Sequence, residues 1–112
     1  ALLDSQVPGH VSALLRAEGK ILRARAGFDE DPRRSLDDAI TMLRLCGSPY
    51  HLANGLLDHA SYLLEAGDPR TAEGLLGEAR SLGQELRAGP LLDRVEKLFL
   101  RLGVIREAEA KS

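Results

Sequence analysis

The sequence is poor in residues that carry specialised chemistry. Its 112 residues include no Trp, only 4% aromatic residues and a single cysteine, Cys46. One cysteine excludes an internal disulfide and a multi-cysteine metal site, and it fits a reducing compartment. The scarce aromatics offer no platform on which bases stack, and a formal net charge of -2 gives little attraction for phosphate backbones or anionic membranes. We therefore expect a cytoplasmic chain with no cofactor and no nucleic-acid or membrane partner.

Long apolar runs are also missing. No stretch approaches 18 apolar residues, and residues 1–10 lack the basic start and apolar core of a signal peptide. The chain begins at Ala1 rather than Met, and its helical pattern starts within a dozen residues. We expect it to be a fragment of a longer protein.

The abundant residues are helix formers, with 22 Leu and 14 Ala. Apolar positions recur at helical spacing in five segments that Gly and Pro separate. The pattern predicts an all-α single domain over residues 1–112, with a helical hairpin over about 10–46, a second over about 49–87 and a terminal helix over about 90–103. Gly103 is expected to end that last helix.

The two hairpins nearly repeat one another. The second copy contains Leu56, His59, Ala60, Leu63, Asp68, Pro69, Ala72, Leu76 and Ala79. The first contains, in the same order, Leu15, Glu18, Gly19, Leu22, Asp31, Pro32, Ser35, Ala39 and Met42. A repeat of about 35 to 40 residues built from two amphipathic helices is typical of an α-helical solenoid, which buries its core by stacking and leaves an extended binding surface.

The second copy resembles a tetratricopeptide repeat. Its spacing Leu56-x2-His59-Ala60-x2-Leu63, followed by Ala72-x3-Leu76, matches W-x2-L-G-x2-Y and A-x3-F without the aromatics. The resemblance implies an α-α superhelix of antiparallel hairpins. The small residues are expected where paired helices approach closely, and these are Gly19, Ala60, Ala72 and Ala79.

A wider resemblance covers about four fifths of the chain. Gly47-x-Pro49-x-x-Leu52-Ala53 leads into Leu57-x-His59-Ala60, and Leu75-Leu76-x-Glu78-Ala79-Arg80 leads to a glycine turn and Pro90. These runs resemble the C-terminal repeats of large bacterial signalling proteins, in which a class III adenylate or guanylate cyclase, or a transcriptional regulator, is joined to a P-loop ATPase. No P-loop occurs here, so the resemblance implies that any cyclase or ATPase chemistry lies in other domains.

The sequence gives little support for a catalytic site or a metal-binding site. Asp58, His59 and Ser61 suggest a hydrolase, but neighbours one or two apart on a helix do not face each other, and a packed structural histidine is expected instead. His51 and His59 lack a third ligand at helical spacing. The acidic segment 29–31 lacks the spacing of a calcium loop and is expected to be a helix-capping turn.

A better-supported candidate for a binding site is a stripe of basic residues on the first helix. Arg16, Lys20 and Arg23 recur at i, i+4 and i+7, so they share one side of that helix. The repeat alignment would place them on the concave surface, continued on the third helix by Asn54, Leu57, Ser61, Leu64 and Glu65. Such a groove would hold an acidic or carboxylate-ended protein segment, for example from another domain of the parent. The alternative is a solvated face that serves only solubility.

The predicted core is continuous through the helices and comprises Leu14, Leu15, Leu22, Leu36, Leu43, Leu56, Ala60, Leu63, Leu76, Ala79, Leu98 and Phe99. A solenoid cut from its neighbours exposes apolar ends, so self-association is expected through Leu2, Leu3 and Val7 or through Leu100 and Val104. Two functions remain open: a non-catalytic protein-interaction or regulatory module, and a passive spacer that packs only on neighbouring repeats.

Overall fold

The computed structural model describes residues 9–25, 27 and 31–111, and describes side chains for 16–24, 27 and 31–111. That part of the chain folds into five α-helices and contains no strand. The helices are α2 (Gly9–Arg25), α3 (Pro32–Cys46), α4 (Pro49–Ala66), α5 (Pro69–Leu86) and α6 (Gly89–Lys111). None of these helices is both long enough and apolar enough to cross a membrane.

Short polar turns join the helices and reverse the chain. Between α4 and α5, Gly67 adopts the left-handed conformation with φ of 86°, and its backbone N–H donates to the carbonyl of Leu63. The carboxylate of Asp68 then accepts a 3.2 Å hydrogen bond from the backbone N–H of Thr71, and Pro69 occupies the first turn of α5. Glycine, capping aspartate and proline thus end one helix and begin the next within three residues.

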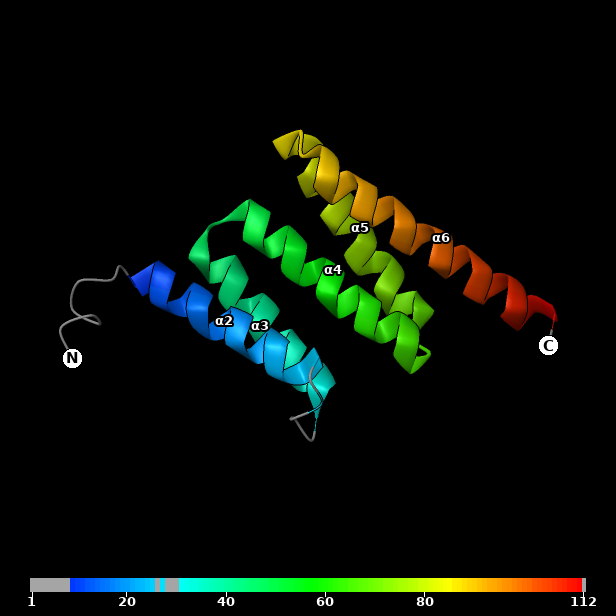
Figure 1. Cartoon of the computed structure of the whole chain (residues 1–112), viewed down its shortest axis with the longest axis horizontal. Helices are drawn as coiled ribbons and strands as arrows, with labels where there is room; N and C mark the ends of the chain where they lie inside the picture. The colour runs from blue at the N-terminus through cyan, green and yellow to red at the C-terminus, as the bar shows by residue number, and fades with distance from the viewer. Residues whose placement is uncertain (1–8, 26, 28–30, 112) are drawn as a thin grey trace.

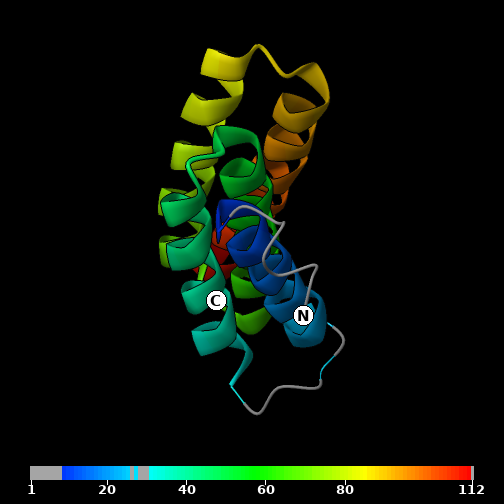
Figure 2. The ribbon, with the colours of Figure 1, turned by 90° about the vertical axis from the view of Figure 1, so that its left-hand side faces the viewer.

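Consecutive helices pack antiparallel and form two layers. Helices α2, α4 and α6 lie side by side in one layer, and α3 and α5 lie behind them in the other (Figure 1; Figure 2). Because the direction of the chain alternates, the three helices of the first layer run parallel to one another. The first layer therefore brings together residues about forty positions apart in the sequence.

The core is built mainly from Leu and Ala between the two layers. Phe99 is partly buried against it, and the guanidinium of Arg80 lies over the Phe99 ring, 4.1 Å from the centroid. Eight members of the predicted core are buried: Leu36, Leu43, Leu56, Ala60, Leu63, Leu76, Ala79 and Leu98. Two further members, Leu14 and Leu15, lie outside the described side chains, and the predicted contact residues Leu2, Leu3 and Val7 lie outside the described residues.

The register predicted for the first repeat is wrong in α2. Leu22 is 63% exposed, whereas the buried residues among the described side chains of this helix are Ala17, Ile21 and Ala24. These three recur at a spacing of four and then three, so they share one side of α2, and that side excludes Leu22. Leucine content suggested one side of the helix, but packing against α3 and α4 selected the side that carries two small alanines.

Small residues do occupy the close helix contacts, with one exception. Ala60, Ala72 and Ala79 have no exposed surface, so they are buried between helices as a close contact requires. Gly19 was wrongly placed at such a contact, because a Cβ on it would meet nothing within 4 Å. The closest approach involves Gly55, where an added Cβ would lie 2.4 Å from Cδ1 of Leu43 on α3.

The last helix is longer than predicted. Gly103 does not end α6, which continues to Lys111. A glycine in a helix interior costs only about 1 kcal/mol relative to alanine, and the following residues, 105–111, are mostly good helix formers. The left-handed glycines that end other helices, such as Gly47 with φ of 70°, have no counterpart at Gly103.

Candidate functional site

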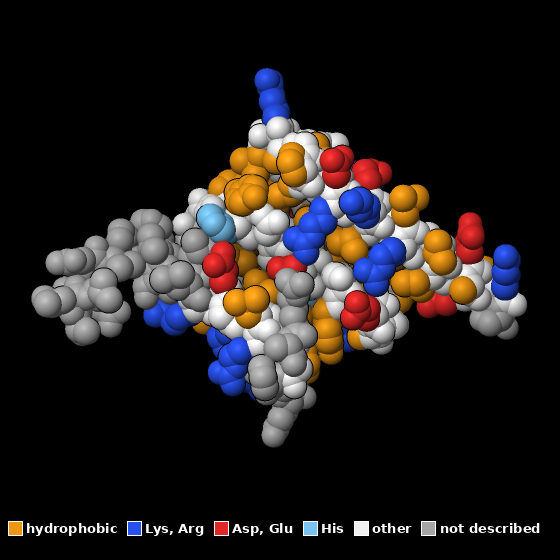
Figure 3. Space-filling model, viewed as in Figure 1, with side chains coloured by type: hydrophobic (Ala, Val, Ile, Leu, Met, Phe, Trp, Pro, Cys, Tyr) orange, Lys and Arg blue, Asp and Glu red, His pale blue; other side chains and the backbone are white. Residues whose placement is uncertain are grey.

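The first layer presents a polar surface, here termed the α2–α4–α6 face. Figure 3 views this face directly and shows basic side chains gathered over the strip between α4 and α6, with acidic side chains beside them. Helix α4 is the middle of the face, and it contacts both α2 and α6. Its outward residues are therefore the ones that both neighbours can reach.

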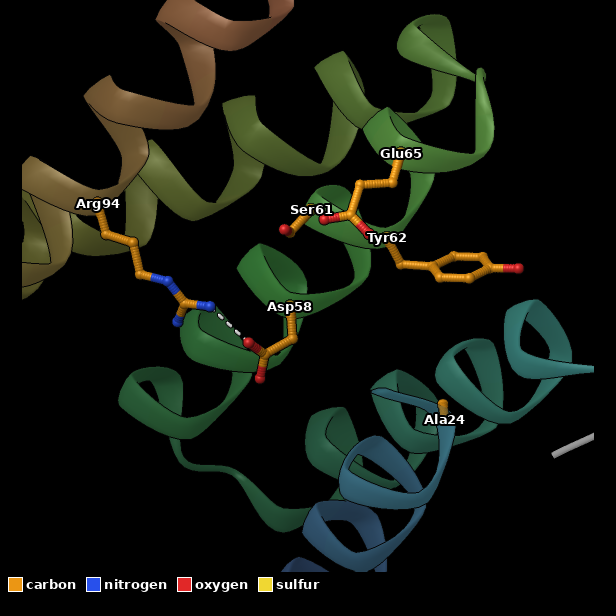
Figure 4. Close-up of a pocket in the computed structure, with 6 residues that line it drawn as sticks. All are labelled: Ala24, Asp58, Ser61, Tyr62, Glu65 and Arg94. Atoms are coloured by element: carbon orange, nitrogen blue, oxygen red, sulfur yellow. Dashed lines mark hydrogen bonds and ion pairs between the residues drawn. The ribbon is translucent and has the colours of Figure 1, made fainter. Parts of the chain in front are cut away.

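A cavity of about 340 Å³ opens on this face, and we call it the α4 cavity. Among the described side chains that line it, Ala24 comes from α2 and Arg94 from α6. Outward positions of α4 supply the other described lining residues, namely Asp58, Ser61, Tyr62 and Glu65. The cavity therefore exists only when three helices distant in sequence are stacked (Figure 4).

The polar centre of the α4 cavity is an ion pair between two helices. Arg94 reaches from α6 to α4 and donates a hydrogen bond of 2.5 Å to the carboxylate of Asp58 (Figure 4). The same guanidinium donates to the side-chain oxygen of Asn54 at 3.3 Å. The Asp58 side chain retains 15% exposure and that of Arg94 38%, so the pair is partly shielded from water. Such a charge-assisted bond is stronger than one on an open surface.

A second, looser pair continues the seam between α4 and α6. Arg101 lies 3.8 Å from the carboxylate of Glu65, and both side chains are about half exposed or more. Arg101 follows Arg94 by seven residues, as Glu65 follows Asp58 by seven. Two turns of helix separate the pairs on each side, so parallel α4 and α6 are held in register by both.

The residues predicted on the third helix divide between surface and core. Ser61 and Glu65 line the α4 cavity, and Asn54 lies beside it through its bond to Arg94. Leu57 and Leu64 were wrongly assigned to the groove, because they are 0% and 4% exposed and belong to the core. The buried side of α4 is wide enough to include both leucines, which lie two helical turns apart.

The predicted basic stripe lies on the outer part of α2. Arg16 and Arg23 are exposed and Lys20 is half-buried. None of the three lines the α4 cavity, to which Ala24 is the contribution from the described side chains of α2. The stripe and the cavity are therefore two separate features of the structure.

The suspected hydrolase group does not assemble. Asp58 and Ser61 line the α4 cavity, but His59 is turned into the helix packing with 3% exposure, as expected for a structural histidine. Neither ring nitrogen of His59 has a hydrogen-bond partner, and Nδ1 lies 3.6 Å from the carboxylate of Asp37. Burial lowers the pKa of His59, an effect that Asp37 partly opposes and Arg33 adds to. His59 is therefore neutral near pH 7 and remote from the cavity chemistry.

The other suspected ligands have local structural roles. His51 Nδ1 and the hydroxyl of Ser48 lie 2.6 Å apart across the first turn of α4. Asp31 caps α3 by accepting a 3.1 Å hydrogen bond from the backbone N–H of Arg34, as predicted for the acidic turn. Asp29 and Glu30 lie outside the described residues. Within the part of the chain that is described, no group of three or more His, Cys, Asp or Glu side chains is placed to hold a metal ion.

Sequence reasoning missed Arg94, Asp58 and Tyr62 as cavity residues. Arg94 belongs to α6, to which the repeat alignment assigned no residue of the groove. The sequence does contain a signal for the pairing of α4 with α6, because Arg94 and Arg101 are seven residues apart, as are Asp58 and Glu65, and the two pairs have opposite charge.

Comparison of this chain with protein-family models, curated proteins and solved structures finds no match.

Proposed function

We propose that this chain is a non-catalytic protein-interaction module of a tetratricopeptide-like superhelix that holds a peptide segment on its α2–α4–α6 face. The observation that carries the proposal is the α4 cavity, because three stacked helices contribute to it and its described lining combines a methyl group, two side chains with hydroxyls and three charged groups. Fixed charged and hydroxyl groups can hydrogen-bond to the backbone and polar side chains of a peptide, while the Ala24 methyl and the Tyr62 ring offer apolar contact.

The fold supports a binding role more than a catalytic one. The histidine that a hydrolase would need is buried and does not line the cavity with Ser61. The residues at the cavity are instead held by ion pairs between helices, as for Asp58 and Arg94, which gives a fixed surface. A preformed surface binds with a smaller loss of conformational entropy than a flexible one.

The basic stripe of Arg16, Lys20 and Arg23 extends the proposal to an acidic or carboxylate-ended segment. In this arrangement the segment would cross the α4 cavity, and its carboxylates would lie toward α2. The resemblance to bacterial signalling proteins supports another domain of a longer parent, such as a cyclase, regulator or P-loop ATPase domain, as the source of the segment. Catalysis, in that case, belongs to those domains.

A peptide array of acidic, neutral and basic decamers tests this function directly. Ser61→Trp should fill the α4 cavity and abolish binding of the peptides that the unmodified chain retains. Ser81→Trp is the matched control, because Ser81 is exposed on α5 in the other layer. Arg16→Glu should weaken the acidic peptides selectively, since exposed charges act over about 10 Å at 0.1 M salt.

The alternative is a passive spacer that packs only on neighbouring repeats. An array that binds no peptide, or binds the Ser61→Trp and Ser81→Trp variants equally well, would favour the spacer. A melting temperature that is unchanged in both variants is the control for folding.

A further inference from the structure

The outer side of α6 carries a regular row of exposed residues, here termed the α6 row. Its members are separated alternately by four and three positions, the spacing that keeps residues on one side of a helix that packs against another helix. They are Asp93, Lys97, Leu100, Val104, Glu107 and Lys111, and all six are exposed.

The α6 row faces away from the rest of the molecule. The buried residues of α6 are Leu91, Val95, Leu98 and Leu102, about half a turn around the helix from the row. Helix α6 also forms one edge of the layer, so no described helix covers its outer side (Figure 1). A second helix can therefore approach the row along its whole length of about 27 Å.

The centre of the row is apolar and unusually exposed. Leu100 and Val104 are 71% and 65% exposed. Together with Ile105 and Arg101 they border a shallow, mostly apolar hollow of about 380 Å³. Gly103 lies beside them without a side chain, and a Cβ there would meet nothing within 4 Å, so a partner helix can come close.

The row is complementary to itself when reversed. Its six members form three pairs, and the two residues of each pair lie at equal distances along the sequence before and after Leu102. These pairs are Asp93 with Lys111, Lys97 with Glu107, and Leu100 with Val104. If two copies of α6 lie antiparallel with the two-fold axis at Leu102, each acidic residue of the row faces a basic one, and the apolar residues face each other. In a two-fold interface every such contact occurs twice.

We propose that the α6 row is a homodimer interface in which two copies of the chain pack α6 against α6, antiparallel about Leu102. The occupant is a second copy because charge and apolarity match only in the reversed direction. In a parallel arrangement each residue faces the equivalent residue of the second copy, so that Asp93 lies opposite Asp93 and Lys97 lies opposite Lys97. The interface lies at the edge of the layer, and it leaves the α4 cavity open, because none of the six residues of the α6 row is among the described lining of that cavity.

The dimer is expected to be weak. Its apolar contacts come from two residues per copy, and its charged pairs are exposed, so each contributes little in salt. The row also contains the attractive helix-neighbour pairs Asp93–Lys97 and Glu107–Lys111, which stabilise the isolated helix and explain the charges without a partner. A test must therefore separate contacts within one helix from contacts between copies.

Charge exchange achieves this separation. Lys97→Glu alone and Glu107→Lys alone each set like charges opposite one another twice in the dimer. By sedimentation equilibrium at low salt, each variant should associate about tenfold or more weakly than the unmodified chain, which should show a monomer–dimer equilibrium at submillimolar concentration. An equimolar mixture of the two variants should regain the association, because the glutamate introduced at position 97 of one copy then faces the lysine introduced at position 107 of the other. Contacts within one helix are the same in the mixture as in the separate variants.

Leu100→Asp tests the apolar centre, and Leu45→Asp is its matched control, since Leu45 is 81% exposed on α3. Leu100→Asp should abolish the dimer, and Leu45→Asp should retain it, with equal helical content in both. A chain that stays monomeric up to about 1 mM, a mixture that associates no better than its components, or a Leu45→Asp variant as defective as Leu100→Asp would overturn the proposal.

Discussion

The guanidinium of Arg94 on α6 lies 2.5 Å from the carboxylate of Asp58 on α4, and this pair joins the seam between the two helices to the α4 cavity. The two residues stand 36 positions apart in the sequence. One contact therefore helps to set the helix stacking and also fixes the charge that the cavity presents. The neighbouring pair of Arg101 and Glu65 is longer and more exposed, which provides an internal comparison.

Arg94→Ala should destabilise the fold by about 1 to 3 kcal/mol, because it removes a partly shielded, charge-assisted hydrogen bond to the mostly buried carboxylate of Asp58. Arg101→Ala should change the free energy of unfolding by no more than about 0.5 kcal/mol, since its pair is open to solvent. Urea unfolding of both variants measures the difference. Equal effects of the two substitutions would show that the seam does not depend on the shielded pair.

Gly55→Ala should destabilise the chain by about 1 to 3 kcal/mol, because the new methyl group would lie 2.4 Å from Leu43 and 3.3 Å from Ile40 in a packed interface. Gly77→Ala is the matched control in α5, where an added Cβ meets nothing within 4 Å. There alanine should stabilise by about 0.5 to 1 kcal/mol through its higher helix propensity. Thermal melts that shift in the same direction for both variants would contradict the close approach of α3 and α4.

The helices could be predicted from the sequence because residues with known preferences for helix ends mark where each one starts and stops. Gly67, Asp68 and Pro69 each have a local reason to stop or start a helix, and the structure confirms the turn there. The register of α2 could not be predicted in the same way. Leu22 and Ile21 are adjacent and both apolar, and only packing against α3 and α4 decides which one is buried.

The α4 cavity was harder to predict than the helices. Ser61 and Glu65 were found because the repeat pattern orders the residues of α4, but Arg94 enters from a helix whose stacking the pattern does not fix. The surface of a solenoid depends on the angle and offset between repeats, which arise from interhelix packing. Leu57 and Leu64 show the same limit, because a small rotation of α4 decides whether they face the groove or the core.

His59→Leu should stabilise the protein slightly at pH 7 and remove part of its pH dependence. Both ring nitrogens of His59 are buried without hydrogen-bond partners, so an apolar side chain of similar size removes a desolvation cost; we expect a gain of up to about 1 kcal/mol. Burial lowers the pKa of His59 in the folded chain, so the unfolded chain binds more protons below its ordinary pKa of about 6.5. The contribution of His59 to stability should therefore fall as pH decreases from about 6.5 toward its lower pKa in the folded chain, and it should become constant below that pKa.

Urea unfolding at pH 7.5, 6.0 and 5.0 measures this effect. Hydrogen bonds from Arg44 lower the pKa of Glu78, and hydrogen bonds from the side chain and then the backbone of Thr71 lower the pKa of Asp68, so the stability from these carboxylates is lost only at more acidic pH, below about 4.5. Between pH 7.5 and 5.0 these two carboxylates therefore keep their charge, and the difference between the unmodified chain and the His59→Leu variant measures the contribution of His59. His59→Leu should flatten the slope in this interval. A His59→Leu variant that loses stability with acid as steeply as the unmodified chain would show that His59 accepts its proton equally well in the folded state, and that its buried position has no energetic consequence.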